Sequence, residues 1–330
     1  MTNPLQLEIL DLRHFSARQL RPLLEQEAAL WLTRLRWDYR PSTELLLQYL
    51  DSRILPGFVA IDQGRIAGFC FCVYESQKAV IGDVYAAPAP PTSHSQAVVV
   101  ETLTRHLLEL LDASPDILRV EAQLLLFDEG VLPPLFQANL RRDKMLHTYP
   151  RLFLECDLAV AVPVQTLEIP EDVELCRWSP SFYQPAAELI QRSYIGHPDA
   201  DINDQYRTLA GAERFLHNII RFPGCGTFDA DSSLVLRKRD TNGMVALLLC
   251  SRVSHDTAHV TQLCVHPHYR GRRLGEALLR LSLHQLPSRK FQALTLTVSE
   301  ANARAVRLYR ATGFRTLHRF DALVIEKVTR

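Results

Sequence analysis

Hydrophobic and polar positions alternate in several short stretches of the chain, which predicts strands joined by tight turns. Each half carries two such stretches on either side of a hairpin signal: Gly57–Ile61 and Arg65–Tyr74 around Asp62-Gln63-Gly64, then Ser233–Leu236 and Met244–Cys250 around a loop ending in Asn242-Gly243. The pattern indicates a hairpin-rich sheet in each half.

The same order of elements then recurs in both halves. A strand ending in proline is followed by an amphipathic helix, a further strand and a late tetrad: Val80–Pro88, Val98–Leu111, Leu118–Leu125 and Leu135–Ala138, then His259–Pro267, Gly275–Leu286, Ala293–Val298 and Leu308–Ala311. The prolines lie 179 positions apart and the tetrads 173, which fits a duplication with small insertions. We therefore predict a mixed α/β (α+β) architecture built twice, not one large doubly wound sheet.

Two stretches lack a regular period and predict connections. Ala86–Gln96 is rich in proline and serine, and Ala159–Asp172 carries its three charges, all acidic, near its end. We interpret the second as a linker between domains at 1–160 and 171–330.

Composition narrows the class of partner. The 330 residues are 47% hydrophobic, and 37 lysines and arginines balance 37 aspartates and glutamates, which favours neither nucleic acid nor an anionic membrane. Apolar runs are strand-sized, too short for a bilayer, and the first residues do not resemble a secretory signal. The seven cysteines form no C-x-x-C pair, and Cys70 and Cys72 should share one strand face. We expect a reduced, cytoplasmic protein with buried thiols.

A candidate phosphate site follows the strand that ends in Val265-His266-Pro267. The segment from Arg270 to Glu276 has glycines at 271 and 275, and a helix is expected to start at the second. Such a loop aims unpaired backbone N–H groups and the positive end of a helix dipole at one point, which suits a pyrophosphate. A basic surface turn is the alternative. The spacing is neither a P-loop nor a dinucleotide fingerprint.

A second motif lies within the next 40 residues. Leu296–Asn302 predicts a strand and a helix start, and Ala305, Leu308-Tyr309 and Gly313-Phe314 follow at helical spacing. With the first motif, this segment resembles the GNAT acetyltransferase superfamily over roughly residues 171–330. Arg270 and Gly275 match the ends of that family's coenzyme A motif, whereas Arg273 stands where the family usually has glycine.

The resemblance implies two tandem GNAT-like domains, each with a mostly antiparallel sheet that is splayed at the coenzyme site. Acetyl-CoA would be the cosubstrate, and no metal is expected. The backbones of Leu263, Cys264 and Val265 would pair with the pantetheine arm. The pyrophosphate would lie at the motif that begins with Arg270, on the backbone amides of Gly271, Arg272, Arg273, Leu274, Gly275 and Glu276. Asn302 would lie beside the arm, and Tyr309 would protonate the leaving thiolate.

Each of these residues also has a purely structural interpretation. Tyr309 could be a half-buried helix tyrosine, and Asn302 could cap its helix. His255, His259, His266 and His268 lack a cysteine partner at finger spacing, so they do not indicate zinc. His259 or Asp256 could serve as general base, although solvated surface is the interpretation that we favour for both.

The first half has lost both chemical motifs. Ala89–Gln96, which follows Pro88, contains neither glycine nor arginine, and Phe136 stands where Tyr309 stands in the second half. We interpret this half as a degenerate copy. An active first domain that uses other residues is the alternative.

We therefore predict an N-acetyltransferase with one active site and a small-molecule or peptide amine as acceptor. A non-catalytic acyl-CoA-binding module is the alternative, and transfer to oxygen is also open. The acceptor should enter beside Tyr194–Tyr206, because Asp199, Asp201 and Asp204 would attract a cationic amine. A solvated acidic loop is the other interpretation of this segment.

Overall fold

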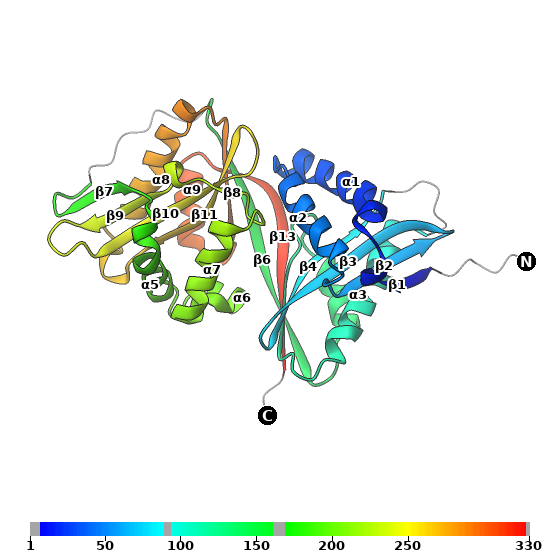
Figure 1. Cartoon of the computed structure of the whole chain (residues 1–330). Coiled ribbons are helices and arrows are strands. Elements are labelled where there is room, and N and C mark those ends of the chain that lie inside the picture. Colours follow the sequence, from blue (N-terminus) through cyan, green and yellow to red (C-terminus); the bar gives the residue numbers. More distant parts are fainter. Residues whose placement is uncertain (1–6, 89–93, 161–168, 328–330) are drawn as a thin grey trace, which may run out of the picture. The chain divides into compact units, whose positions relative to one another are not determined.

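The computed structural model describes residues 7–88, 94–160 and 169–327. Its contacts divide the chain into two compact units, one of Met1–Arg34, Tyr39–Pro150 and Arg319–Arg330, the other of Leu35–Asp38 and Arg151–His318. Each unit is a sheet flanked by helices (Figure 1). Parts of both predicted connections, residues 89–93 and 161–168, lie outside the described residues. The domain limits 1–160 and 171–330 stay a prediction.

The sheet of the first unit has the strand order β1-β2-β3-β4-β5-β13. Its strands are β1 (Glu8–Asp11), β2 (Gly57–Asp62), β3 (Arg65–Glu75), β4 (Lys78–Ala86), β5 (Arg119–Gln123) and the end of β13 (Arg315–Lys327). All pairs are antiparallel except β4 with β5. Gln63 and Gly64 take positive φ of 51° and 74°, as the hairpin signal predicts.

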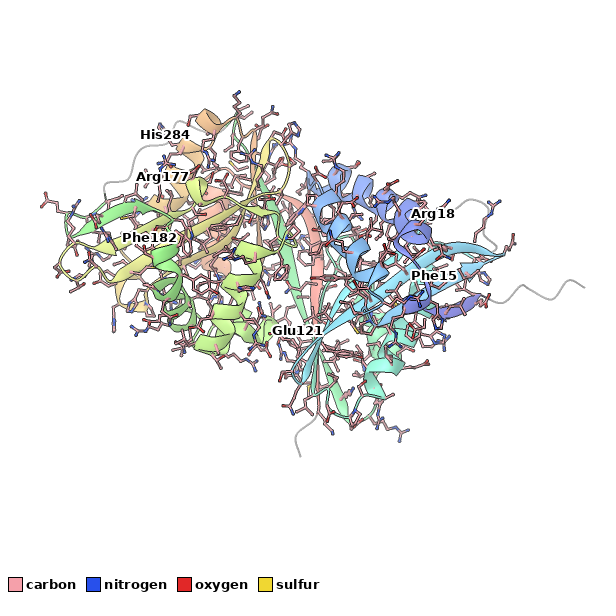
Figure 2. The ribbon with its side chains drawn as sticks, in the orientation of Figure 1. Phe15, Arg18, Glu121, Arg177, Phe182 and His284 are labelled. Carbon is pink, nitrogen blue, oxygen red and sulfur yellow. The ribbon has the colours of Figure 1, made fainter. Side chains whose placement is uncertain are left out.

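Helices cover both faces of this sheet. They are α1 (Ala17–Leu35), α2 (Arg40–Asp51), α3 (Gln96–Asp112) and α4 (Leu132–Ala138). α1 and α2 pack on the face that carries Phe69 and Tyr85, and α3 packs on the other. Cys70 and Cys72 both face α3, as their alternation predicts. At the start of α1 the chain is amphipathic, with Phe15 in the core and Arg18 exposed (Figure 2).

The second unit has the strand order β6-β12-β11-β10-β9-β7. Its strands are the second half of β6 (Lys144–Asp157), β7 (Val173–Arg177), β8 (Thr227–Phe228), β9 (Leu234–Lys238), β10 (Met244–Arg252), β11 (Thr257–Val265) and β12 (Ala293–Ser299). β11 and β12 are parallel, and the other pairs are antiparallel.

The helices of this unit also lie on two faces. They are α5 (Tyr183–Ser193), α6 (Asp199–Ile202), α7 (Leu209–Arg221), α8 (Leu274–Gln285) and α9 (Ala303–Ala311). α5 and α7 pack with Leu247, Leu249 and Cys264, whereas α8 and α9 pack with Leu248 and Val260 on the opposite face. The two helices predicted at Val98–Leu111 and Gly275–Leu286 are α3 and α8, and each begins and ends within two residues of the prediction.

The duplication is visible in the strand register. In the second unit, β10 and β11 pair with a bulge that leaves Thr261 unmatched, and the parallel pairing of β11 with β12 ends at Val260. In the first unit, the bulge between β3 and β4 leaves Gly82 unmatched, and the pairing of β4 with β5 ends at Ile81. Both positions differ by 179, the spacing of the two prolines.

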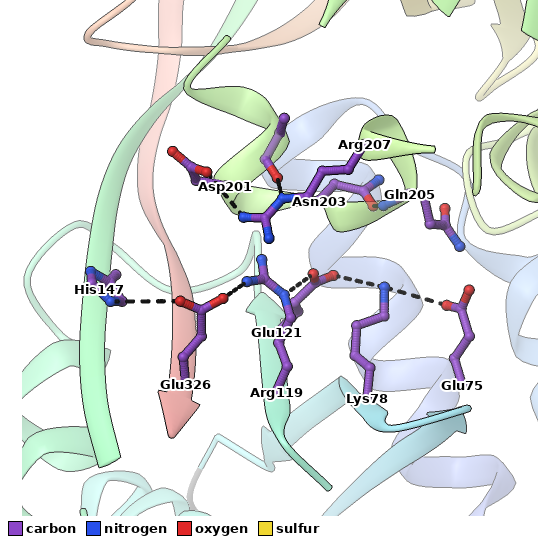
Figure 3. A network of polar contacts seen from close by, with 11 residues as sticks. Glu75, Lys78, Arg119, Glu121, His147, Asp201, Asn203, Gln205, Arg207 and Glu326 are labelled. Atoms are coloured by element: carbon purple, nitrogen blue, oxygen red, sulfur yellow. Dashed lines mark hydrogen bonds and ion pairs between the residues drawn. The ribbon is translucent and has the colours of Figure 1, made fainter. Parts of the chain in front are cut away.

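A row of paired charges joins β3, β4, β5 and β13 of the first unit (Figure 3). Lys78 lies 3.3 Å from Glu121 and 3.4 Å from Glu75, Arg119 lies 2.6 Å from Glu121, and Arg119 also pairs with Glu326 on β13. Buried charges require such partners. Residues Ala322–Glu326 thus complete the first unit's sheet, because they pair with β5.

Candidate active site

Strands β11 and β12 separate at their C-terminal ends, just before the two segments that carry the predicted motifs. Their last parallel pair is Val260 with Leu296, yet β11 continues to Val265 and β12 to Ser299. The strands separate because the bulge at Thr261 redirects β11. The opening exposes one backbone edge of β11 to a ligand that could lie between the strands.

The loop after β11 presents unpaired backbone amides. The N–H groups of Gly271 through Glu276 donate no hydrogen bond within the described part of the chain. α8 begins at Leu274, so its dipole adds positive potential at the same place. Gly271 has a φ of 85°, which glycine adopts without strain. This arrangement suits an anion such as a pyrophosphate.

The arginines of this loop already have protein partners. Arg270 donates to the carbonyl of Ser193 at 2.6 Å, Arg272 pairs with Asp172 at 3.0 Å, and Arg273 makes two hydrogen bonds to Glu276. The backbone amides, more than these side chains, therefore provide the loop's unsatisfied donors.

Arg273 occupies the helix N-cap in the left-handed conformation, with φ 57° and ψ 18°. This conformation favours glycine, because a Cβ crowds the following carbonyl. Arg273 therefore adopts a backbone conformation that suits glycine, and its side chain adds local strain.

A groove of about 700 Å³ runs beside this loop. Arg192 of α5, Gly243 of the β9–β10 hairpin, and His266, Tyr269 and Arg272 line it, among others. It lies within the second unit and borders the segment that leads from β11 to the amides.

Tyr309 lies on the α8–α9 side of the opening. Its side chain belongs to the buried core, is 8% exposed, and its hydroxyl makes no hydrogen bond within the described residues. Burial raises the pKa of Tyr309 above its ordinary value, and the negative charge of Asp199 raises it further. The hydroxyl thus remains protonated at neutral pH and can act as an acid.

Asn302 caps α9 by accepting a hydrogen bond from the backbone N–H of Ala305 at 3.1 Å. Its amide nitrogen also lies 3.3 Å from the ring of His197. The capping interpretation is therefore correct, and a coenzyme contact stays a prediction.

The segment 194–206 reaches the opening from the α5–α7 side. Asp199 accepts a hydrogen bond from the hydroxyl of Ser299 at the end of β12, and its side chain is only 14% exposed. Tyr194 donates to the amide oxygen of Gln262 on β11 at 2.8 Å and stacks on Tyr206 at 4.2 Å. The segment is therefore attached to both separated strands.

Two of the three predicted aspartates of this segment, Asp199 and Asp201, differ in their surroundings. Asp201 is 58% exposed and pairs with Arg207 at 3.0 Å. Asp199, in contrast, raises the pKa values of Tyr194, Tyr206 and Tyr309, in each case after burial as the main cause. Asp199 is the acidic group that faces the opening.

Sequence reasoning missed two residues of the site, Arg151 and Gln262. Arg151 stands opposite Ser299 in the β6–β12 register, and its guanidinium lies 4.0 Å from Asp199. Gln262 is 4% exposed, and its oxygen also accepts the N–H of Leu263 at 3.1 Å. The sequence does indicate the bulge beside Gln262. Apolar residues of one strand face are normally two positions apart, whereas Val260 and Leu263 are three positions apart.

The predicted solvated position of His259 is wrong. Its side chain is 5% exposed, lies 2.9 Å from the hydroxyl of Thr295, and packs between Trp37 and Phe153. Burial lowers the pKa of His259 to about 3, so it is a neutral core residue. Asp256 is 16% exposed and organises a turn by accepting from Ser254 and Thr257.

The described residues contain no group of three or more histidine, cysteine or acidic side chains that could hold a metal ion. None of their helices is long and apolar enough to cross a membrane.

Parts of this sequence and its fold resemble known proteins. Residues 199–314 match the acetyltransferase (GNAT) family. A mycothiol acetyltransferase from Stackebrandtia nassauensis is 38% identical over 91 residues, which make up 26% of this chain and 29% of that relative. The chain thus matches less than a third of that protein's length.

Two solved structures have the same fold over nearly the whole chain. A tandem GNAT protein from the clavulanic acid biosynthesis pathway gives a TM-score of 0.61 at 15% identity, covering 98% of this chain and 99% of its own. A GCN5-related N-acetyltransferase from Sphaerobacter thermophilus gives 0.63 at 15% identity, covering 100% and 98%.

The parted parallel strands and the amide-lined loop before α8 lie within the residues that match this family. Residues 199–314 belong to the acetyltransferase (GNAT) family, and the chain has the fold of a tandem GNAT protein. Members of this family generally use acetyl-CoA as the acyl donor.

Proposed function

We propose that the second unit transfers an acetyl group from acetyl-CoA directly to a primary amine. The observation that carries this proposal is the opening between β11 and β12, which has Asp199 on one side and Tyr309 on the other. The hydroxyl of Tyr309 makes no hydrogen bond to any residue that the structure describes. A donor thioester and an acceptor could meet there, and holding both in one place is itself a large part of such catalysis.

The coenzyme would extend from the loop into the opening. Its pyrophosphate would accept from the amides of Gly271–Glu276, the groove beside His266 would leave space for its nucleotide end, and its pantetheine arm would follow Leu263–Val265. The side chain of Gln262 would have to release the Leu263 N–H before the arm could accept from it.

The acceptor nitrogen would attack the thioester carbon, so that a C–N bond forms and the C–S bond breaks. The departing sulfur would take its proton from Tyr309, the proton lost by the amine would pass to solvent, and Tyr309 would regain a proton from solvent. Tyr309 could fill this role because its hydroxyl is protonated at neutral pH and makes no hydrogen bond within the described residues.

The first unit, in this proposal, is a degenerate copy that binds no coenzyme. Phe136 is fully buried where the second unit has Tyr309. The ring of Phe71 covers the bulge, since a Cβ on Gly82 would lie 2.2 Å from it. The side chain of Ser95 caps α3 by accepting from Val98, so one amide of that helix start is already satisfied.

We further propose that the acceptor is a small molecule or peptide amine and that the protein works in the reducing cytoplasm. All seven cysteines are free thiols, five of them buried, which supports the second point. Cys176 and Cys225 are half-buried instead.

Release of free CoA from acetyl-CoA, measured with pooled amines and separately with pooled alcohols, tests this function. Amine-dependent release with calorimetric binding of one CoA per chain is the expected result. Binding without release from any amine would favour the non-catalytic module. Two equivalents of bound CoA would refute the degenerate copy.

A further inference from the structure

Arg151 is a largely buried cation whose partners are incomplete. Its side chain is 12% exposed, and its Nε is buried with no acceptor among the described residues. A guanidinium keeps its charge in proteins, and a buried charge is costly unless it is paired and hydrogen-bonded.

The groups around Arg151 do not fill this need. Nη1 lies 3.5 Å from the hydroxyl of Ser299 and 4.0 Å from the nearer oxygen of Asp199. That same oxygen of Asp199 already accepts the Ser299 hydroxyl. The two-pronged contact that arginine makes with a carboxylate is therefore absent between Arg151 and Asp199.

A second donor of the same site is also unmatched. Nε2 of Gln262 is buried without an acceptor among the described residues, while Oε1 accepts from Tyr194 and Leu263. Tyr194 and Arg151 belong to one cluster, because the charge of Asp199 raises the pKa of Tyr194 and Asp199 lies 4.0 Å from Arg151. The site thus has two buried donors without acceptors among the described residues, Nε of Arg151 and Nε2 of Gln262, and they complement a ligand rich in acceptors.

We propose that the acceptor carries a carboxylate next to its amine, as an amino acid does, and that Arg151 binds this carboxylate while Asp199 faces the amine. The neighbouring cation and anion of the site complement the neighbouring charges of a zwitterion. The planar carboxylate matches the donor fork of the guanidinium. This assignment rests on the proposed function, because it names the substrate class of the same site.

The test compares matched acceptors that differ only in the carboxylate. Free amino acids, their carboxamides, their decarboxylated amines and the corresponding aminophosphonates are each supplied with acetyl-CoA, and release of CoA is followed for the full chain and for Arg151→Gln. We expect the amino acids to be preferred. We expect the variant to raise their KM roughly 30-fold or more, as when a buried charge loses its partner, with the KM for acetyl-CoA unchanged.

Two further variants separate recognition from folding. Arg151→Lys keeps the charge without the fork and should give an intermediate KM at unchanged thermal stability. Arg177→Gln removes an exposed arginine on the edge strand β7 (Figure 2) and should change neither KM. Equal use of acids and carboxamides, an unchanged KM in Arg151→Gln, or a preference for aminophosphonates would overturn the proposal.

Binding separates this proposal from the proposed function. Calorimetry of amino acids against the CoA-loaded protein requires no turnover. Binding that is lost in Arg151→Gln, with no CoA release from any amine, would refute the transferase and leave the carboxylate site standing. Amine-dependent release of CoA that is equal for acceptors with and without a carboxylate would support the transferase and refute the carboxylate site.

Discussion

Asp199 accepts a hydrogen bond from the hydroxyl of Ser299, 100 residues further along the chain. This bond attaches the segment after α5 to the end of β12, at the point where β12 has separated from β11. An acidic side chain of a connecting segment thereby becomes part of the wall of the proposed active site.

Asp199 and Asp201 should differ sharply in their effect on the acceptor. Asp199→Asn removes the negative charge that faces the opening, so we expect a higher KM for the amine and an unchanged KM for acetyl-CoA. Asp201→Asn is the matched control, because this carboxylate is exposed and paired with Arg207. An equal effect of both substitutions, disappearing at high salt, would instead indicate long-range attraction.

Gly275 should tolerate a methyl group but not a branched side chain. A Cβ there would lie 3.4 Å from Cγ2 of Val265, which is close but bearable. Gly275→Ala should bind CoA almost normally. Gly275→Val adds two methyl groups beside the amides and should weaken binding by at least about tenfold, or 1.4 kcal/mol. Calorimetry on the folded variants measures both affinities for CoA. Wild-type affinity in the valine variant would show that the coenzyme does not bind at these amides.

Tyr309→Phe deletes only a hydroxyl. Loss of a general acid typically lowers turnover about 10²–10⁴-fold, and we expect this drop in kcat with CoA affinity unchanged. The variant should fold, because Phe136 fills the matching position of the first unit with its ring fully buried. Tyr183→Phe is the control, since its hydroxyl only donates to the carbonyl of Glu213. Near-normal turnover of Tyr309→Phe would show that another group, or none, protonates the sulfur.

Replacing Arg273 by glycine should relieve backbone strain. Its left-handed conformation costs a non-glycine residue about 1–2 kcal/mol. Its ion pair with Glu276 offsets little of this, because the arginine is 64% exposed. Arg272→Gly is the control. It also makes the unfolded chain more flexible, which lowers stability, but it relieves no strain because Arg272 has no positive φ. Urea unfolding should therefore find Arg273→Gly the more stable by about 1–2 kcal/mol, and equal stabilities would contradict the strain.

The first unit should lose stability as the pH rises through about 6. Glu27 of α1 and Asp83 of β4 are buried together. Burial raises the pKa of Asp83 to about 6, and burial followed by the charge of Asp83 raises the pKa of Glu27. The folded state therefore holds protons more tightly than the unfolded chain. Its advantage is complete at acid pH and disappears as the pair ionises.

Glu27→Gln should remove most of this pH dependence. A glutamine can still accept from Trp31, which donates to Glu27 at 2.9 Å, and it can donate to Asp83 at any pH. We expect the variant to be the more stable protein at pH 8 and to show a flatter profile in urea unfolding between pH 4 and 8. Asp143→Asn, at an exposed position, is the control. Parallel profiles for Glu27→Gln and wild type would show that the raised pKa of Glu27 does not cause the pH dependence.

The local features of both units could be predicted from the sequence. Hairpin turns, amphipathic helices and the loop from Arg270 to Glu276 depend on residues close together in the chain, and their periods specify them. The repeat followed from comparing the two halves. The contrast between Tyr309 and Phe136 followed from the same comparison, because matched positions of a duplicated fold occupy matched places.

Contacts between distant segments required the tertiary structure. Asp199 and Asp201 look alike in the sequence, and only the return of β12 beside the segment gives one of them a role at the opening. His259 looks like a surface histidine until Trp37 and Phe153 pack against it. Arg151 carries no motif at all, and its unsatisfied donor appears only because strand pairing places it opposite Ser299. Local preferences determined the elements, whereas burial and long-range pairing determined which polar groups are left without partners and so available to a substrate.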